Sequence, residues 1–115
     1  MLWEISNLSN NKIAVVGHGG MGSKHRYPMN SFSSLMYSVD AGVQGVEMDL
    51  RMSADSVLVL YHNETLESMT NGKGTIRENN WETISTCKYR DLFSGEEYVI
   101  RPQTFITAVK TQTVF

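Results

Sequence analysis

A strand, a helix and a second strand follow one another in the first half of the chain, and this order constrains the fold most. The β-branched run Ile13–Gly17 predicts a buried strand with His18 at its exit, because continuous apolar strands are typical of parallel sheets. A helix should begin at a cap, either Asn30 or Ser31, and gather its apolar residues on one face (Phe32, Leu35, Met36, Val39). The run Val43–Arg51 then predicts the second strand. A right-handed crossover would make the two strands parallel neighbours.

The third predicted strand, Val57–Tyr61, follows a short turn at residues 53–56 and delivers His62 at its end. A turn of about four residues ordinarily makes an antiparallel hairpin, since a parallel return needs a dozen or more residues. The pattern leaves the pairing of this strand open, because two strands joined by a tight turn need not be direct partners. In either case the acidic residues of the second strand and His62 can lie near one edge of the sheet.

Titratable side chains gather at the ends of the predicted strands. Glu47 and Asp49 stand two residues apart, so a continuous strand would place both carboxylates on one face, together with Arg51. Two adjacent carboxylates repel each other unless a cation lies between them, and oxygen ligands suit a hard divalent cation. His18 and His62 carry imidazoles that can move protons near neutral pH. The alternative is structural, with a solvated strand face and two hydrogen-bonded histidines.

The second half of the chain is less regular. A turn-rich segment, Asn71–Gly74, extends the long loop after His62, and such loops are more often functional than idle. A helix is expected around Trp81–Cys87, and another should begin at a Thr104 cap. Cys87 is the single cysteine, so it cannot form an internal disulfide and is expected to be an unreactive thiol rather than a nucleophile.

Length and composition set the limits of these interpretations. With 115 residues the chain is expected to form one small domain, and a formal charge of -2 gives no reason to expect nucleic-acid binding. No apolar segment reaches the roughly 20 residues that cross a bilayer, and residues 1–12 do not resemble a signal peptide. The sequence therefore predicts a soluble, unsecreted chain, although a longer parent protein could be cytoplasmic or exported.

Five short motifs occur in a fixed order along residues 13–74. They are Gly17-His18, Pro28-Met29-Asn30-Ser31, Gly45-Val46-Glu47-Met48-Asp49, His62-Asn63-Glu64-Thr65-Leu66 and Thr70-Asn71-Gly72-Lys73-Gly74. In this order and spacing they resemble the glycerophosphodiester phosphodiesterase family, and Ile100–Thr104 is similar to the start of a helix in that family. Each motif alone is weakly specific, but five in order make the resemblance strong.

The resemblance implies an α/β fold, namely the amino-terminal part of a TIM (β/α)8 barrel of the PLC-like phosphodiesterase type, with about three strands present. Such barrels typically take about 250 residues, so residues 1–115 would form a single partial domain, truncated before the later barrel strands. The implied activity is hydrolysis of glycerophosphodiesters, which are small-molecule substrates, to glycerol 3-phosphate and an alcohol. By resemblance, His18 and His62 would be the general acid and base, and Glu47 and Asp49 would bind Ca²⁺ or Mg²⁺.

Two departures from the family's pattern concern the phosphate. Gly19 stands where the family usually has an arginine, and Met29 stands where it usually has a glutamate. The loss of both is understandable if they form an ion pair in the family, because either one alone would be costly to bury. We therefore expect another cation to face the substrate phosphate. The candidates are Lys24, His25, Arg26 and Arg51.

Other departures concern the second histidine and the metal. Asn63 replaces the family's usual aspartate, and Ser68 stands where an arginine is common, so both changes bear on specificity or on the orientation of His62. The family's third carboxylate ligand would lie beyond Phe115. Two carboxylates alone would hold a metal weakly.

Two other function classes stay open at this point. A related sphingomyelin or lysophospholipid phosphodiesterase would use the same scaffold, because a fold does not set its substrate. A catalytically inactive barrel fragment would act only in binding or assembly, and its exposed strand edges would favour self-association.

Overall fold

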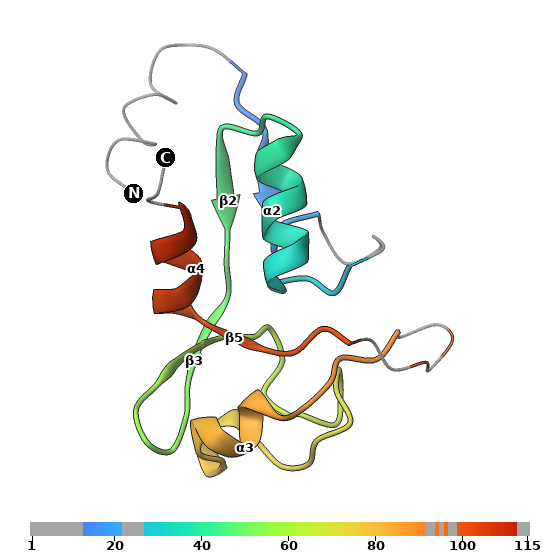
Figure 1. Cartoon of the computed structure of the whole chain (residues 1–115), viewed down its shortest axis with the longest axis vertical. Helices are drawn as coiled ribbons and strands as arrows, with labels where there is room; N and C mark the ends of the chain where they lie inside the picture. The colour runs from blue at the N-terminus through green and yellow to red at the C-terminus, as the bar shows by residue number, and fades with distance from the viewer. Residues whose placement is uncertain (1–12, 22–26, 92–93, 95, 97–98, 113–115) are drawn as a thin grey trace.

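The computed structural model describes residues 13–21, 27–91, 94, 96 and 99–112. These residues form two units and a final helix (Figure 1). The parallel unit comprises β1 (Val16–His18), α2 (Phe32–Asp40) and β2 (Gly45–Glu47). The antiparallel unit comprises β3 (Leu50–Met52), β4 (Leu58–Leu60), η1 (Ile76–Glu78), α3 (Trp81–Ser85) and β5 (Gln103–Thr104). The final helix, α4 (Phe105–Gln112), packs against β4 and β5.

In the parallel unit, β1 and β2 pair in parallel with His18 opposite Glu47, so the predicted parallel pairing of these strands is confirmed. β1 is shorter than the predicted strand, and Val15 and Val16 are 57% and 48% exposed. The prediction of a buried strand is therefore wrong. Among the described residues β1 has a single strand partner, β2, so one of its edges carries no neighbour.

Helix α2 begins where the local sequence predicts. Ser31 is the cap, because its Oγ accepts a hydrogen bond from the Ser34 amide at 3.2 Å. The same hydroxyl donates to the Pro28 carbonyl at 2.6 Å, which fixes the start of the helix. Asn30 is not the cap: it has a left-handed backbone, with φ 65°, and its side chain serves a different contact.

The chain passes from one sheet to the other between β2 and β3, and the predicted continuous strand Val43–Arg51 is wrong. Met48 and Asp49 belong to neither strand. The Asp49 amide donates to Asn30 Oδ1 at 2.8 Å, and the Asp49 carbonyl accepts from the Tyr61 amide at 3.0 Å. The carboxylates of Glu47 and Asp49 therefore come from two segments rather than from one face of a regular strand.

In the antiparallel unit, β3 and β4 form a tight hairpin, which was one of the two pairings left open by the sequence. Leu50 lies opposite Leu60, and Met52 lies opposite Leu58. β5 adds a third strand with Gln103 opposite Leu60. This strand was not predicted, because two residues leave no pattern of alternation to recognise.

The helices follow their capping residues. The Thr104 cap is confirmed, since Thr104 Oγ1 accepts from the Thr107 amide at 3.2 Å at the start of α4. α3 lies where a helix was expected but ends at Ser85. η1 was not predicted, although Thr75 and Glu78 form a capping box around it. None of the helices in the described residues has the length and apolar character needed to cross a bilayer.

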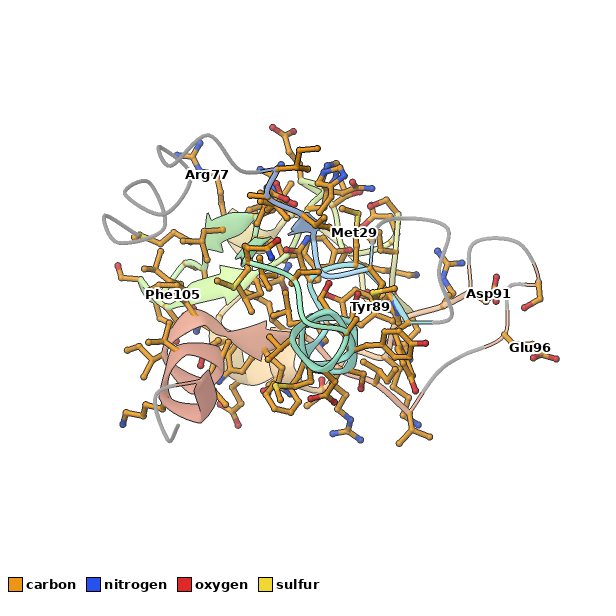
Figure 2. The ribbon with its side chains drawn as sticks, turned by 90° about the horizontal axis from the view of Figure 1, so that it is seen from above. Met29, Arg77, Tyr89, Asp91, Glu96 and Phe105 are labelled. Carbon is orange, nitrogen blue, oxygen red and sulfur yellow. The ribbon has the colours of Figure 1, made fainter. Side chains whose placement is uncertain are left out.

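The main core lies inside the antiparallel unit. Its buried members come from the segment before α2, from β4 and the loop after it, and from η1, α3 and the segment after α3 (Met29, Val59, Tyr61, Leu66, Met69, Ile76, Ile84, Cys87, Tyr89). Tyr61 and Tyr89 stack with ring centroids 6.0 Å apart. Tyr89 lies inside the molecule, whereas Asp91 and Glu96 lie at its margin (Figure 2). A smaller cluster of Leu35, Leu60 and Ala108 joins α2, β4 and α4.

Candidate active site

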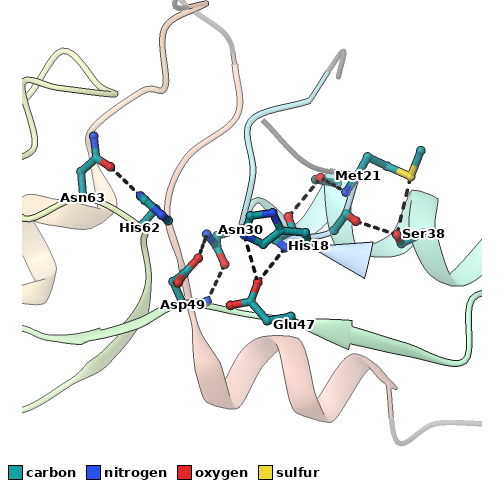
Figure 3. A network of polar contacts seen from close by, with 11 residues as sticks. His18, Met21, Asn30, Ser38, Glu47, Asp49, His62 and Asn63 are labelled. Carbon is teal, nitrogen blue, oxygen red and sulfur yellow. Dashed lines mark hydrogen bonds and ion pairs between the residues drawn. The ribbon is translucent and has the colours of Figure 1, made fainter. Parts of the chain in front are cut away.

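Four of the predicted site residues lie near one another where strands of both units end (Figure 3). His18 ends β1 and Glu47 ends β2, and the parallel register places them opposite each other. Asp49 follows in the link to β3, and His62 lies just after β4. In Figure 3, His18 and Glu47 form one end of the site and His62 forms the other, with Asp49 between them.

The Glu47 carboxylate is oriented by the chain that follows β1. The Gly19 amide donates to Glu47 Oε2 at 3.1 Å, and His18 Nε2 lies 3.7 Å from the same oxygen. The His18 and Glu47 side chains are 71% and 44% exposed, so an ion pair between them, which requires a protonated imidazole, adds little stability. Their exposure instead makes both groups accessible to a ligand.

Asn30 orients the Asp49 carboxylate. Its Nδ2 donates to Asp49 Oδ2 at 3.0 Å, while its Oδ1 accepts from the Asp49 amide at 2.8 Å. The Asn30 side chain is fully buried, and its own amide donates to the Gly19 carbonyl at 2.7 Å. We did not predict this role from the sequence. The one signal in the sequence was an asparagine directly before the serine that caps the helix.

His62 is held through both its ring and its backbone. Its Nδ1 lies 2.7 Å from Asn63 Oδ1 (Figure 3). Its carbonyl accepts from Arg51 Nε at 3.0 Å and from Arg51 Nη2 at 2.8 Å. Figure 3 shows the ring between Asn63 on one side and Asp49 with Asn30 on the other. The contact with Asn63 thus turns Nδ1 of His62 away from Asp49.

The predicted phosphate-binding cations fall into two groups. Lys24, His25 and Arg26 lie outside the described residues. Arg51 lies in β3, and two of its nitrogens donate to the His62 carbonyl. In this structure its guanidinium therefore binds the backbone of a site residue. A phosphate contact by any of these four residues stays a prediction.

The two phosphate-related departures, Gly19 and Met29, fit each other in space. Gly19 has φ 60°, and a Cβ built on it would lie 2.8 Å from Met29 Cε. Met29 is buried and belongs to the main core. A larger residue at position 19 would therefore have to displace a core side chain, as well as adopt a left-handed backbone.

Tyr61 anchors the loop that carries His62 and Asn63. Its hydroxyl donates to the Thr65 carbonyl at 2.9 Å and lies 3.2 Å from the Leu66 carbonyl. Burial raises the pKa of Tyr61 to about 12, so the phenol stays protonated and keeps donating at neutral pH. Burial also raises the pKa of the Cys87 thiol, which agrees with the prediction of an unreactive cysteine.

Two carboxylate oxygens remain available for a cation. Within the described residues, no hydrogen bond reaches Glu47 Oε1 or Asp49 Oδ1. Such oxygen donors suit Ca²⁺ or Mg²⁺. The same part of the chain holds no group of three or more His, Cys, Asp or Glu side chains placed to bind a metal ion. The carboxylates of Glu47 and Asp49 are therefore chemically suited to a hard cation and would supply only part of its ligands.

Residues 21–113 match the Glycerophosphoryl diester phosphodiesterase family. The chain belongs to this family. The matched segment includes Glu47, Asp49 and His62 and begins just after His18. The resemblance drawn from five motifs in the sequence is thus confirmed.

Curated members of the family show how much of the protein this chain represents. A glycerophosphodiester phosphodiesterase of Caldanaerobacter subterraneus is 29% identical over 89 residues, which are 74% of this chain and 36% of that protein. Glycerophosphodiester phosphodiesterase 1 of Bos taurus is 30% identical over 73 residues, which are 64% of this chain and 22% of that protein. The chain therefore spans well under half the length of these relatives.

Solved structures of the family confirm the fold class. A glycerophosphoryl diester phosphodiesterase from Parabacteroides distasonis matches with a TM-score of 0.77 and 30% identity, covering 89% of this chain and 35% of that one. An Oleispira antarctica phosphodiesterase, solved with the product sn-glycerol-3-phosphate, matches with a TM-score of 0.72 and 23% identity, covering 89% and 40%. These neighbours are TIM barrels, and this chain corresponds to a part of such an α/β barrel with a few strands.

Proposed function

We propose that this site hydrolyses glycerophosphodiesters to glycerol 3-phosphate and an alcohol. The supporting observation is that His18, Glu47, Asp49 and His62 converge at strand ends in a member of the glycerophosphodiester phosphodiesterase family. Histidines that exchange protons and carboxylates that bind a cation are the groups that cleavage of an anionic phosphodiester needs.

The two histidines suit a reaction in two steps. One imidazole removes the proton from the glycerol hydroxyl beside the phosphate, and the hydroxyl oxygen then attacks phosphorus. The other imidazole protonates the departing alcohol oxygen as its bond to phosphorus breaks. Water opens the resulting cyclic phosphate with the two roles exchanged. His18 and His62 are both exposed, as this exchange with substrate and water requires.

Glu47 and Asp49 would hold the divalent cation, either Ca²⁺ or Mg²⁺. When bound, that ion supplies charge neutralisation at the non-bridging phosphate oxygens. The Gly19 amide and Asn30 each engage one oxygen of a carboxylate and leave the other for the ion. Two carboxylates are fewer than the roughly six to eight oxygens that Ca²⁺ takes, so water, substrate or residues outside the described ranges complete the set.

The test is release of glycerol 3-phosphate from glycerophosphocholine by the purified full chain, with Ca²⁺, with Mg²⁺ and with a chelator. We expect release that the chelator abolishes and that His18→Ala or His62→Ala lowers by about a hundredfold or more, the usual scale of acid–base catalysis. Release of choline from sphingomyelin or lysophosphatidylcholine, without cleavage of glycerophosphocholine, would favour the related phosphodiesterases instead.

Matched glutamates give the control. Glu47→Gln should lower release at least as strongly as a histidine variant, whereas Glu64→Gln, at another exposed carboxylate, should leave it unchanged. Absence of release from folded chain, or release that neither chelator nor His18→Ala affects, would contradict the proposed function.

A further inference from the structure

A chain of hydrogen bonds runs from the His62 ring back into the loop that follows it. His62 Nδ1 lies 2.7 Å from Asn63 Oδ1, and Asn63 Nδ2 donates to Ser68 Oγ at 2.9 Å. Ser68 Oγ in turn donates to the Thr65 carbonyl at 2.7 Å. The four residues thus connect an exposed imidazole to the backbone of the loop.

The last bond sets the direction of the others. A hydroxyl has one proton, and the Thr65 carbonyl can only accept, so the Ser68 proton points to Thr65. Ser68 Oγ must then accept from Asn63, which requires the amide nitrogen of Asn63 to face Ser68. The amide oxygen of Asn63 consequently faces His62 Nδ1, and that nitrogen has to carry a proton.

Thr65, where this series of hydrogen bonds ends, is held firmly in place. The Thr65 carbonyl also accepts from the Tyr61 hydroxyl at 2.9 Å, and Thr65 forms a bridge with Thr75. Tyr61 is fully buried in the main core. The Arg51 guanidinium meanwhile fixes the carbonyl of His62. The ring is therefore held from a rigid loop rather than from solvent-exposed side chains alone.

We propose that Ser68, acting through Asn63, is a positioning residue that keeps neutral His62 in the Nδ1–H tautomer. Nε2 then carries the lone pair, on the side of the ring that faces Asp49 in Figure 3. In the proposed hydrolysis, on which this catalytic consequence rests, Nε2 is the atom at which His62 takes up and returns a proton. Without the chain of bonds, an exposed imidazole would distribute its proton between both nitrogens.

The test is the ¹⁵N spectrum of the histidine side chains in the full chain at about pH 8.5, where an ordinary imidazole is neutral. The His62 signals are identified by their loss in His62→Gln. We expect Nδ1 to appear as the protonated nitrogen and Nε2 as the unprotonated one. This measurement needs no turnover, so its outcome is independent of the proposed function.

The variants separate positioning from general loosening of the loop. Ser68→Ala should change the tautomer ratio roughly fivefold toward Nε2–H, the effect of losing one ordinary hydrogen bond. Asn63→Asp, which still offers an acceptor to Nδ1, should retain the wild-type tautomer. Asn79→Ala is the control. Asn79 Nδ2 also donates hydrogen bonds to carbonyls of this loop, those of Lys73 and Thr75, but Asn79 does not contact His62.

Two results would overturn the proposal. One is a wild-type His62 that carries its proton on Nε2. The other is a Ser68→Ala ratio equal to that of the wild type or shifted no more than in Asn79→Ala. If the expected tautomer is seen in a chain that releases no glycerol 3-phosphate, the positioning role stands and the proposed hydrolysis fails.

Discussion

The parallel and antiparallel units are held together by different chemistry. In the parallel unit, small residues pack β1 and its following loop against α2: the hydroxyls of Ser34 and Ser38 donate to the carbonyls of Gly19 and Gly20 at 3.3 and 2.8 Å. In the antiparallel unit, buried apolar and aromatic side chains form the interior (for example Tyr61, Leu66, Ile76, Ile84, Tyr89). One unit relies on hydrogen bonds at close approach, and the other relies on apolar burial.

The difference matters because the candidate site draws on both units. His18 and Glu47 come from the parallel unit, and His62 comes from the antiparallel unit. Asp49 lies in the link between them, fixed by Asn30. The well-packed unit therefore provides a rigid support for one histidine, while the other side of the site depends on close backbone contacts and the Asn30 clamp.

The largest expected effect comes from a matched pair of isoleucines. Ile84 is fully buried in the antiparallel unit, whereas Ile13 is 94% exposed beside the parallel unit. Ile84→Ala should lower the free energy of unfolding by about 2–5 kcal/mol, because it removes packed apolar volume. Ile13→Ala should change it by less than about 0.5 kcal/mol.

Urea unfolding of the full chain, followed by circular dichroism, measures both changes. Equal losses in the two variants would mean that another chain segment or a second copy covers Ile13, as the predicted self-association would allow. The contrast between the units would then be an incomplete description of the protein in solution.

A second prediction concerns the connection between the units. Asn30→Ala removes two hydrogen bonds to Asp49 and places alanine at φ 65°, so we expect a loss of about 2–3 kcal/mol in the free energy of unfolding. Asn30→Gly adopts the left-handed backbone without strain, so the free energy of unfolding should fall only by the part due to the lost side-chain amide, about 1–2 kcal/mol. Urea unfolding of the two variants provides the measurement. A glycine variant as unstable as the alanine variant would show that backbone strain plays no part.

What the sequence predicts well in this chain is local. The apolar spacing and the capping of α2 depend on residues within one or two turns. The spacing was predicted, and Ser31 was one of the two caps that the sequence left open. The parallel pairing of β1 and β2 was also predicted, because the crossover leaves few alternatives. The site positions followed from the strand ends, with four of the predicted side chains brought near one another.

What the sequence could not predict depends on distant partners. At the break after β2, the Asp49 amide donates to Asn30, nineteen positions earlier. The alternation of apolar and polar residues in the sequence does not indicate such a contact. β5 forms because Gln103 and Thr104 meet β4, more than forty positions before them. The bonds from Asn63 to Ser68 likewise required the loop's three-dimensional course.

The third prediction tests the close approach in the parallel unit. A Cβ at Gly17 would lie 2.3 Å from Ser38 Oγ and 2.5 Å from the Gly20 carbonyl oxygen. Gly17→Ala should therefore cost about 1–3 kcal/mol by overpacking. Gly72→Ala is the counterpart in the antiparallel unit, where the Cβ would meet Cys87 Sγ at 2.5 Å. A side-chain sulfur can move more readily than a backbone carbonyl, so urea unfolding should show a smaller loss for Gly72→Ala.

The smallest expected effect uses pH to weaken the antiparallel unit selectively. The folded pKa of Tyr61 is raised to about 12 from the ordinary tyrosine value of 10.0, because burial disfavours the phenolate, and burial raises the pKa of Tyr89 as well. Above about pH 10 the unfolded chain loses these protons first, so stability is fully present below pH 10 and falls as pH rises through about 12.

Tyr61→Phe isolates the share of Tyr61. It should cost about 1 kcal/mol at neutral pH through the lost hydroxyl bonds to the Thr65 and Leu66 carbonyls, and it should make the alkaline decline shallower. Urea midpoints measured between pH 7 and about pH 11 give both quantities. An unchanged alkaline slope in Tyr61→Phe would assign the decline to other groups. The Tyr61 hydroxyl would then stabilise the loop through its hydrogen bonds, and its raised pKa would not account for the loss of stability at alkaline pH.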